Sequence, residues 1–317
     1  MLDICRQWEL LPNFTVLSTA NQGVSQARNE GLAIARGEYV FFFDPDDCIF
    51  PGMLSLTFSA ARGRGGADAV HFGYRTTHED QGGFTYVSTE IPKVYVGNDV
   101  IRHEYMPMFF GITQSDIDTW VNADHMWTHR KQFASSWRFL FKRSVLTDNH
   151  ILFYQDVKLS EDRLFIVNFM CYAQSIVAIN DTCYHYFIRK KGCMSSLLSD
   201  GIGLATEKAN LALYRGRIRH LYMKVHNEDI FDCYIGTLVF SCLELIVKLS
   251  DVSLIKSLSA YYTYRKLDDV KVAIREIRID HLPMKLKFPM LLLKCHCDLL
   301  LMIGVRVAKM TGLKVGL

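Results

Sequence analysis

The sequence has no uninterrupted hydrophobic run of membrane-spanning length. Its most hydrophobic late segment, Met290–Met310, contains Lys294 and Asp298 and falls short of the about eighteen apolar residues that a spanning helix needs. No signal peptide starts the chain, and the nine cysteines include no CxxC pair, so we expect reduced thiols in a cytoplasmic protein. The net charge is only +3, which does not indicate nucleic-acid binding.

Composition and length instead indicate a folded protein. Hydrophobic residues make up 50% of the chain and charged residues 22%, which excludes a disordered polypeptide. A chain of 317 residues can form one large domain or two smaller ones. Because the pattern changes to long helices from Gly203 onward, we expect domains at 1–200 and 201–317.

The most informative stretch leads into an acidic loop. The pattern predicts a helix over Gln26–Ala35 with Ser25 as its N-cap, then a strand over Tyr39–Phe43 that is buried on both faces. The loop Asp44–Asp47 follows directly, and the carboxyl ends of strands are where open α/β sheets bind ligands. Crowded carboxylates favour a compensating Mg²⁺ or Mn²⁺, although a solvated acidic turn is the simpler explanation of the loop alone.

A second candidate centre lies at Ser160–Phe165. Ser160 is suited to cap a helix, and Glu161 and Asp162 in the first turn suit the helix dipole. This is a complete structural explanation of the two acids. A carboxylate at a helix start can equally serve as a general base when it reaches the hydroxyl that it deprotonates.

Other patterns complete the predicted architecture. The segment between the two centres is rich in aromatic residues that suit either sugar stacking or core packing: Tyr95, Tyr105, Phe109, Phe110, Trp120 and Trp127. The predicted strands are Phe14–Ser18, Ala67–Tyr74, Ser175–Asn180 and Thr182–Arg189, with a hairpin through His78–Gly83. The predicted helices are Met1–Leu10, Met53–Ala61, Ala205–Val225, Asp229–Leu249, Leu254–Tyr264 and Met290–Met310.

The order N-x-G-x-S-x-A-R-N-x-G followed by G-E-Y-V-F-F-F-D-P-D-D resembles the family 2 glycosyltransferases of the GT-A fold. The resemblance implies an inverting, metal-dependent transfer of sugar from a nucleotide-diphosphate sugar to a glycan or lipid-linked acceptor, in bacterial surface polysaccharide synthesis. The matching residues are Asn21, Gly23, Ser25, Ala27, Arg28, Asn29, Gly31, Gly37, Glu38, Asp44, Asp46 and Asp47.

The resemblance also implies roles for individual residues. Asp162 is the expected base, with Glu161 beside it. The block Trp137–Arg143 resembles the family's W-x-x-L-F-K-R motif, in which the Trp lines the sugar cleft; Arg138 and Phe139 depart from the pattern and leave the sugar open. The expected donor-binding residues are Asn21, Arg28, Asn29, Asp44, Arg189, Lys191 and Ser195. The expected metal ligands are Asp44, Asp46, Asp47 and His185, although a lone His between two Tyr is more often packed in a core.

The family's first strands, with their P-x-Y-N and D-D-G-S segments, have no counterpart in this sequence. We therefore expect an α/β fold with a GT-A-like mixed sheet flanked by helices, truncated at its N-terminus and followed by a helical C-terminal region. A misplaced start, a fragment and a degenerate remnant remain open explanations. The alternatives to an active transferase are a non-catalytic remnant that binds a glycan or a partner and, less favoured, a nucleotidyltransferase.

The last predicted helix has two interpretations. From Lys285 onward the chain carries six basic residues and one acid, which suits a helix lying on the inner face of an anionic membrane. Docking onto the preceding helices explains the same pattern equally well.

Overall fold

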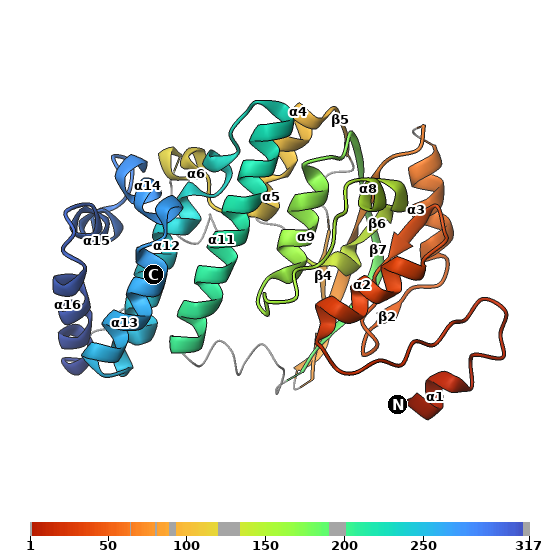
Figure 1. Cartoon of the computed structure of the whole chain (residues 1–317), viewed down its shortest axis with the longest axis horizontal. Helices are drawn as coiled ribbons and strands as arrows, with labels where there is room; N and C mark the ends of the chain where they lie inside the picture. Colours follow the sequence, from red (N-terminus) through yellow and green to blue (C-terminus); the bar gives the residue numbers. More distant parts are fainter. Residues whose placement is uncertain are drawn as a thin grey trace.

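A computed structural model of the protein describes residues 2–63, 65–79, 81–88, 93–119, 134–189 and 201–312. A mixed sheet flanked by helices is followed by a bundle of long helices (Figure 1). This architecture confirms the predicted fold class. No helix of the described ranges combines the length and the hydrophobicity required to cross a membrane.

Seven strands of the described chain form one sheet in the order β1-β6-β3-β7-β2, with β4 paired to β3 and β5 paired to β7. β3 and β7 run parallel, and every other pair is antiparallel. The strands are β1 (Tyr39–Phe41), β2 (Cys48–Ile49), β3 (Ala69–His78), β4 (Gln81–Val87), β5 (Lys93–Val96), β6 (Phe139–Lys142) and β7 (Ser175–Ile188).

Helices cover both faces of this sheet, because the central strands alternate their side chains with a period of two. On β3, Ala69 belongs to the core that includes α9, whereas Val70 and Phe72 belong to clusters that include residues of α3. The helical elements of this part are α1 (Leu2–Arg6), α2 (Val24–Ile34), α3 (Met53–Arg62), α4 (Asn98–Val100), the π-helical turn Ile101–Tyr105, α5 (Pro107–Phe110), α6 (Gln114–Asp118), the 3₁₀ turn Ser136–Arg138, α8 (Arg143–Asp148) and α9 (Glu161–Met170).

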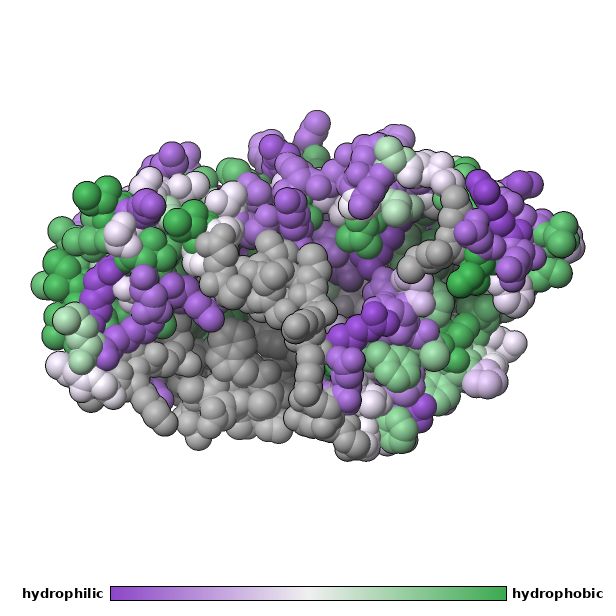
Figure 2. Space-filling model, turned by 90° about the horizontal axis from the view of Figure 1, so that it is seen from below, coloured by the Kyte–Doolittle hydropathy of each residue, from purple (hydrophilic) through white to green (hydrophobic). Residues whose placement is uncertain are grey.

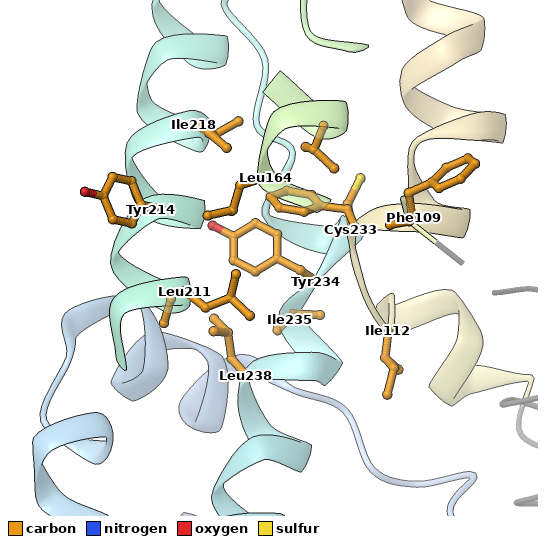
Figure 3. Close-up of a cluster of buried hydrophobic side chains, with 14 of the residues drawn as sticks. Phe109, Ile112, Leu164, Leu211, Tyr214, Ile218, Cys233, Tyr234, Ile235 and Leu238 are labelled. Atoms are coloured by element: carbon orange, nitrogen blue, oxygen red, sulfur yellow. The ribbon is translucent and has the colours of Figure 1, made fainter. Parts of the chain in front are cut away.

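The C-terminal helices share one core with the sheet. Leu164 of α9, Ile218 of the long helix that follows and Tyr234 lie in one cluster (Figure 3). This hydrophobic core therefore continues across the domain boundary predicted at residue 200. The helices are α11 (Gly201–His226), α12 (Ile235–Lys248), α13 (Leu254–Arg265), α14 (Asp268–Glu276), α15 (Met284–Lys294) and α16 (Asp298–Met310), with 3₁₀ turns at Phe231–Cys233 and Leu249–Asp251.

Two strand predictions near the N-terminus are wrong. Residues Phe14–Ser18 form no strand. The strand predicted over Tyr39–Phe43 is the shorter β1, whose residues are only partly buried, and Phe43 is 47% exposed. The reason is position: in the described chain β1 pairs with β6 alone, so it lies at an edge of the sheet.

Of the two predicted N-caps, Ser25 is wrong, and Ser160 is confirmed in position but not in its capping hydrogen bond. α2 begins one residue earlier than Ser25, after Gly23 at φ 92°, and Ser25 is buried inside the helix. Ser160 does precede α9, but its side chain makes no capping hydrogen bond and its backbone is left-handed at φ 65°.

The two strands predicted over Ser175–Asn180 and Thr182–Arg189 are one strand, β7. The chain does not turn between the two predicted strands; the pairing of β7 with β3 instead shifts its register around Gly73. A Cβ at Gly73 would lie 3.2 Å from the Asp181 carbonyl oxygen and 3.0 Å from that of Val87, so the close approach of the strands favours glycine.

The helix predicted over Met290–Met310 is two helices. α15 ends at Lys294 and α16 begins at Asp298, and between them His296 has a left-handed φ of 57°. The helical period alone did not reveal this break, because apolar residues continue with helical spacing on both sides of it.

Candidate functional site

Arg28 connects the two acidic segments that the sequence singled out. Its Nη2 lies 2.8 Å from Asp44 Oδ1, and its Nη1 lies 2.6 Å from Asp162 Oδ1 and 3.5 Å from Glu161 Oε1. Its guanidinium also lies over the ring of Phe153, 5.2 Å from the centroid. α2 therefore brings the loop after β1 and the start of α9 together around one cation, across 134 residues of sequence.

This cation does not fully compensate the three carboxylates. Burial raises the pKa of Glu161, and the charge of Asp162 raises it further, to about 7. Burial likewise raises the pKa of Asp162, although Arg28 and the Ser136 backbone act in the opposite direction. Burial is the largest single effect on the pKa of Arg28 and acts to lower it, but Asp162, Asp44 and Glu161 together outweigh burial and raise the pKa. A proton near neutral pH therefore resides on the Glu161–Asp162 pair rather than leaving Arg28.

The backbone before α9 supports this arrangement. Ser160 has a left-handed backbone with φ 65°. A residue other than glycine usually adopts this conformation only where the surrounding structure enforces it. Glu161 and Asp162 follow as the first two residues of α9. The side-chain amide of Asn29 donates to the Phe153 carbonyl and accepts from the Phe153 N–H, both at 2.8 Å, and so fixes the segment ahead of the helix.

Asn29 was expected to bind the donor, and this expectation does not fit the structure because both ends of its amide are used by the backbone. Asn21 is exposed, and its Oδ1 accepts a hydrogen bond of 3.1 Å from Gly23 N–H in the turn before α2. Asn21 also lines a cavity of about 280 Å³ together with Leu17, Ser18, Thr19, Ala20, Gln22, Gly23, Gln26 and Ala27.

The acids of the loop have different environments. Asp47 is buried, accepts hydrogen bonds from the Tyr184 hydroxyl at 2.7 Å and the Phe187 N–H at 2.9 Å, and has a pKa raised by burial. It therefore anchors the loop to β7. The Asp46 side chain is 47% exposed, with Arg189 Nη2 at 3.6 Å, and the Asp44 side chain is 28% exposed.

His185 does not join these acids as a metal ligand in this structure. Its Nδ1 lies 3.0 Å from Arg75 Nη2 and its Nε2 lies 2.8 Å from Thr77 Oγ1. Burial and the nearby Arg75 lower its pKa. Because each ring nitrogen already has a partner, neither lone pair is available to an ion.

A divalent cation fits a smaller donor set than expected. Within the described ranges, the one group of three potential ligands with mutually close donor atoms is Asp99, His103 and Glu228 on the surface, which does not include the acidic loop. Asp44 and Asp46 offer accessible carboxylate oxygens, and Mg²⁺ is commonly held by one or two carboxylates plus substrate phosphates. Those two residues fit such an ion; Asp47 and His185 do not.

Trp137 does not line an open cleft. Its side chain is buried and stacks on Tyr184 with ring centroids 4.3 Å apart, while Tyr74 meets it edge-on at 4.9 Å. The ring thus belongs to the core on the α3 side of the sheet. The anchoring role of Tyr184 was missed by sequence reasoning; its position beside His185 in the Y-x-Y segment was the available signal.

Several predicted residues lie outside the described residues. They are Lys191, Ser195, Trp120 and Trp127.

Comparison with known proteins gives the family. The model of glycosyl transferase family 2 matches residues 1–147. Glycosyltransferase GlyG of Streptococcus pneumoniae is 23% identical over 282 residues, covering 85% of this chain and 77% of that protein. The poly(ribitol-phosphate) beta-glucosyltransferase of Bacillus spizizenii is 29% identical over 194 residues, covering 60% and 26%. EpsH of Bacillus subtilis is 26% identical over 189 residues, covering 59% and 48%. The chain thus spans about half the length, or less, of several curated relatives that it matches.

A solved structure shares the fold. Staphylococcus aureus TarS 1–349 in complex with UDP-GlcNAc matches with a TM-score of 0.58 and 17% identity, covering 99% of this chain and 80% of that one. An identity this low supports the fold alone. The family model over residues 1–147, the glycosyltransferase relatives and the shared GT-A-like fold together identify a glycosyl transferase family 2 domain in this chain.

Proposed function

We propose that the protein transfers a sugar from a nucleotide-diphosphate donor to a glycan or lipid-linked acceptor, with inversion, in the synthesis of a surface polysaccharide. The observation that carries this proposal is the contact of Arg28 with both Asp44 and Asp162, which joins the loop after β1 to the start of α9. A single displacement needs protein groups that bind the leaving diphosphate and a group that deprotonates the attacking hydroxyl, and these must lie close together.

In this proposal Asp162 acts as the base. It accepts the proton of the acceptor hydroxyl while the acceptor oxygen bonds to the anomeric carbon and the bond from that carbon to the diphosphate breaks. One displacement from the opposite side inverts the configuration. Glu161, with its pKa near 7, holds a proton beside Asp162, so the two neighbouring carboxyl groups do not both carry a negative charge.

Asp44 and Asp46 are the residues that would hold Mg²⁺ or Mn²⁺. Such an ion supplies charge neutralisation for the departing nucleotide diphosphate. Arg28 and Arg189 already lie beside these acids, and their guanidinium groups would bind phosphate oxygens of a donor held there. Lys191 and Ser195 stay predictions of the family resemblance for the same diphosphate.

The comparisons support the substrate class. TarS is described in a complex with UDP-GlcNAc and in another with UDP, which favours a uridine-diphosphate sugar as donor for this chain. Relatives named for poly(ribitol-phosphate) favour a surface polymer as acceptor. We further propose that the protein is cytoplasmic and works peripherally at the inner face of the membrane, where such acceptors are assembled.

Hydrolysis or transfer of UDP-sugars by the purified chain, with added Mg²⁺ or Mn²⁺, tests the proposal. Asp46→Ala should lower metal-dependent turnover at least about tenfold, because it removes a ligand of the ion. Asp268→Ala, whose carboxylate is 96% exposed on α14, is the matched control and should leave turnover unchanged. Equal turnover in Asp46→Ala and wild type rejects the assigned metal site. Nucleotide binding without any turnover favours a non-catalytic binding protein instead.

A further inference from the structure

α15 and α16 each carry two apolar stripes, of which the bundle uses one. Their inward stripes are buried and repeat with helical spacing: Leu286, Met290 and Leu293 on α15, and Met302 and Val305 on α16. The outward stripes repeat with the same spacing but are 42% to 87% exposed. They consist of Met284, Phe288, Leu291, Leu299, Leu300, Ile303, Val307 and Met310, and we call these eight residues the outer face.

Three charged side chains of the two helices, Lys294, Asp298 and Lys309, contact the rest of the bundle, unlike those of a simple amphipathic helix. Lys294 Nζ donates to the carbonyls of Arg275 and Ile277, each at 2.8 Å. Asp298 is buried and pairs with Arg265 at 3.1 Å. Lys309 pairs with Asp251 at 2.8 Å. Because these contacts and the inward stripes already fasten both helices to the bundle, the outer face is not required for docking.

The outer face is apolar, and the two helices that carry it have exposed or partly exposed cations but no exposed acid. Figure 2 shows hydrophobic surface gathered at the end of the molecule where these helices lie. Between Met284 and Met310, Asp298 is the single acid and it is buried, whereas Lys285 is exposed and Lys287 is partly exposed. Patches of this kind mark interaction sites, and the charge favours an anionic partner.

We propose that the outer face of α15 and α16 binds the anionic surface of a lipid bilayer, lying in the interface with Lys285 and Lys287 at the headgroups. α16 has 13 residues and rises about 20 Å, which suits a helix parallel to the surface rather than across it. A second copy of the chain is the less favoured occupant, because lysine is depleted from protein interfaces and favoured at anionic membranes. The inference rests on the proposed peripheral association but not on the transfer reaction.

This mode of binding leaves the candidate site uncovered. α15 and α16 form one end of the molecule, and α2, which carries Arg28, lies in the sheet half away from that end (Figure 1). A chain held through its outer face therefore keeps the acidic loop accessible to a soluble donor.

Flotation of the full chain with phosphatidylcholine vesicles, with or without phosphatidylglycerol, tests the inference. The wild type should bind the anionic vesicles more strongly than the neutral ones. Leu300→Glu with Ile303→Glu should lower the bound-to-free ratio at least about tenfold, because apolar area is lost and negative charge is gained. Leu54→Glu on α3 is the matched control: Leu54 is 54% exposed and Leu300 is 60% exposed, so the control should bind as wild type does.

A second variant keeps the test valid if the double variant folds poorly. Lys285→Gln with Lys287→Gln replaces surface cations, and it should weaken binding to anionic vesicles about fivefold or more and reduce the dependence on salt. Absence of wild-type binding to anionic vesicles, or an equal loss in Leu54→Glu, overturns the inference. If the wild type forms a dimer without lipid, and the double variant breaks this dimer but still binds vesicles as the wild type does, the outer face binds a second copy of the chain. That result also overturns the inference. Unchanged donor hydrolysis in a variant that no longer floats separates this result from the proposed transfer reaction.

Discussion

At the scale of single residues, the site depends on one partly buried cation surrounded by acids. The Arg28 side chain is 12% exposed and contacts Asp44, Glu161 and Asp162. The sequence identified each of these residues, because acidic motifs and an Arg-bearing helix are visible as patterns. Their mutual contact was not predictable, since it depends on how α2 and α9 pack against the sheet.

The raised pKa of Glu161 makes stability depend on pH with a defined sign. The folded protein binds the Glu161 proton up to a pH of about 7, whereas the unfolded chain releases it near its ordinary value of 4.5. The folded state therefore holds more protons between these values, and the free energy of unfolding falls as the pH rises through this window. Glu161→Gln should remove this pH dependence. The free energy of unfolding of the variant should therefore rise relative to that of the wild type by about 3 kcal/mol at most between pH 4.5 and pH 8. Urea unfolding with a chelator present measures the difference, and a pH-independent difference contradicts the assignment.

At the scale of elements, patterns of period and turn residues predicted much of the secondary structure. The helix at Met53–Ala61 and the hairpin of β3 and β4, with His78 opposite Gln81, are confirmed. Ser25 is not the N-cap of α2, and Ser160 holds the N-cap position of α9 without a capping hydrogen bond, because a capping side chain is a preference that tertiary packing overrides. The break before α16 was missed for a related reason: its apolar spacing continues although the backbone turns at His296.

Ser160 gives a prediction for the start of α9. Its φ of 65° is unfavourable for a residue with a Cβ, and its side chain makes no capping hydrogen bond that a substitution would remove. Ser160→Gly should therefore raise the free energy of unfolding by about 0.5 to 1 kcal/mol. Ser144→Gly at the second residue of α8 should lower it by up to a similar amount, because glycine loses more conformational freedom than serine when it adopts a helical backbone. Thermal unfolding of both variants measures this contrast, and destabilisation by Ser160→Gly argues against the backbone geometry.

Asp298 gives a prediction for the docking of α16. Its side chain is 3% exposed and pairs with Arg265, and it also accepts a hydrogen bond from the Tyr261 hydroxyl. Asp298→Ala leaves the Arg265 charge buried without its partner and should cost about 3 kcal/mol of unfolding free energy. Asp268→Ala, which removes an exposed ion pair with Lys271, should cost less than about 1 kcal/mol. Equal effects in urea unfolding would show that α16 is not held by its inward polar contacts.

At the scale of the whole molecule, the sheet and the helical bundle behave as one packed body. The core runs from Phe42 through Leu164 to Met302 without interruption at residue 200. The sequence predicted the fold class and the order of its parts. It did not predict which side of the last helices faces the bundle, because both stripes of α15 and α16 are apolar and the buried one is selected by packing partners far away in sequence.

The central claim is that the start of α9 supplies the base for sugar transfer. The most direct measurement is the turnover of UDP-sugars by Asp162→Asn, compared with wild type and with Asp148→Asn, an exposed acid of α8. Removal of a general base typically costs 10² to 10⁴ in rate, so Asp162→Asn should lose about a hundredfold or more while still binding UDP. The control should retain full turnover. Turnover by Asp162→Asn within about twofold of wild type would contradict the account.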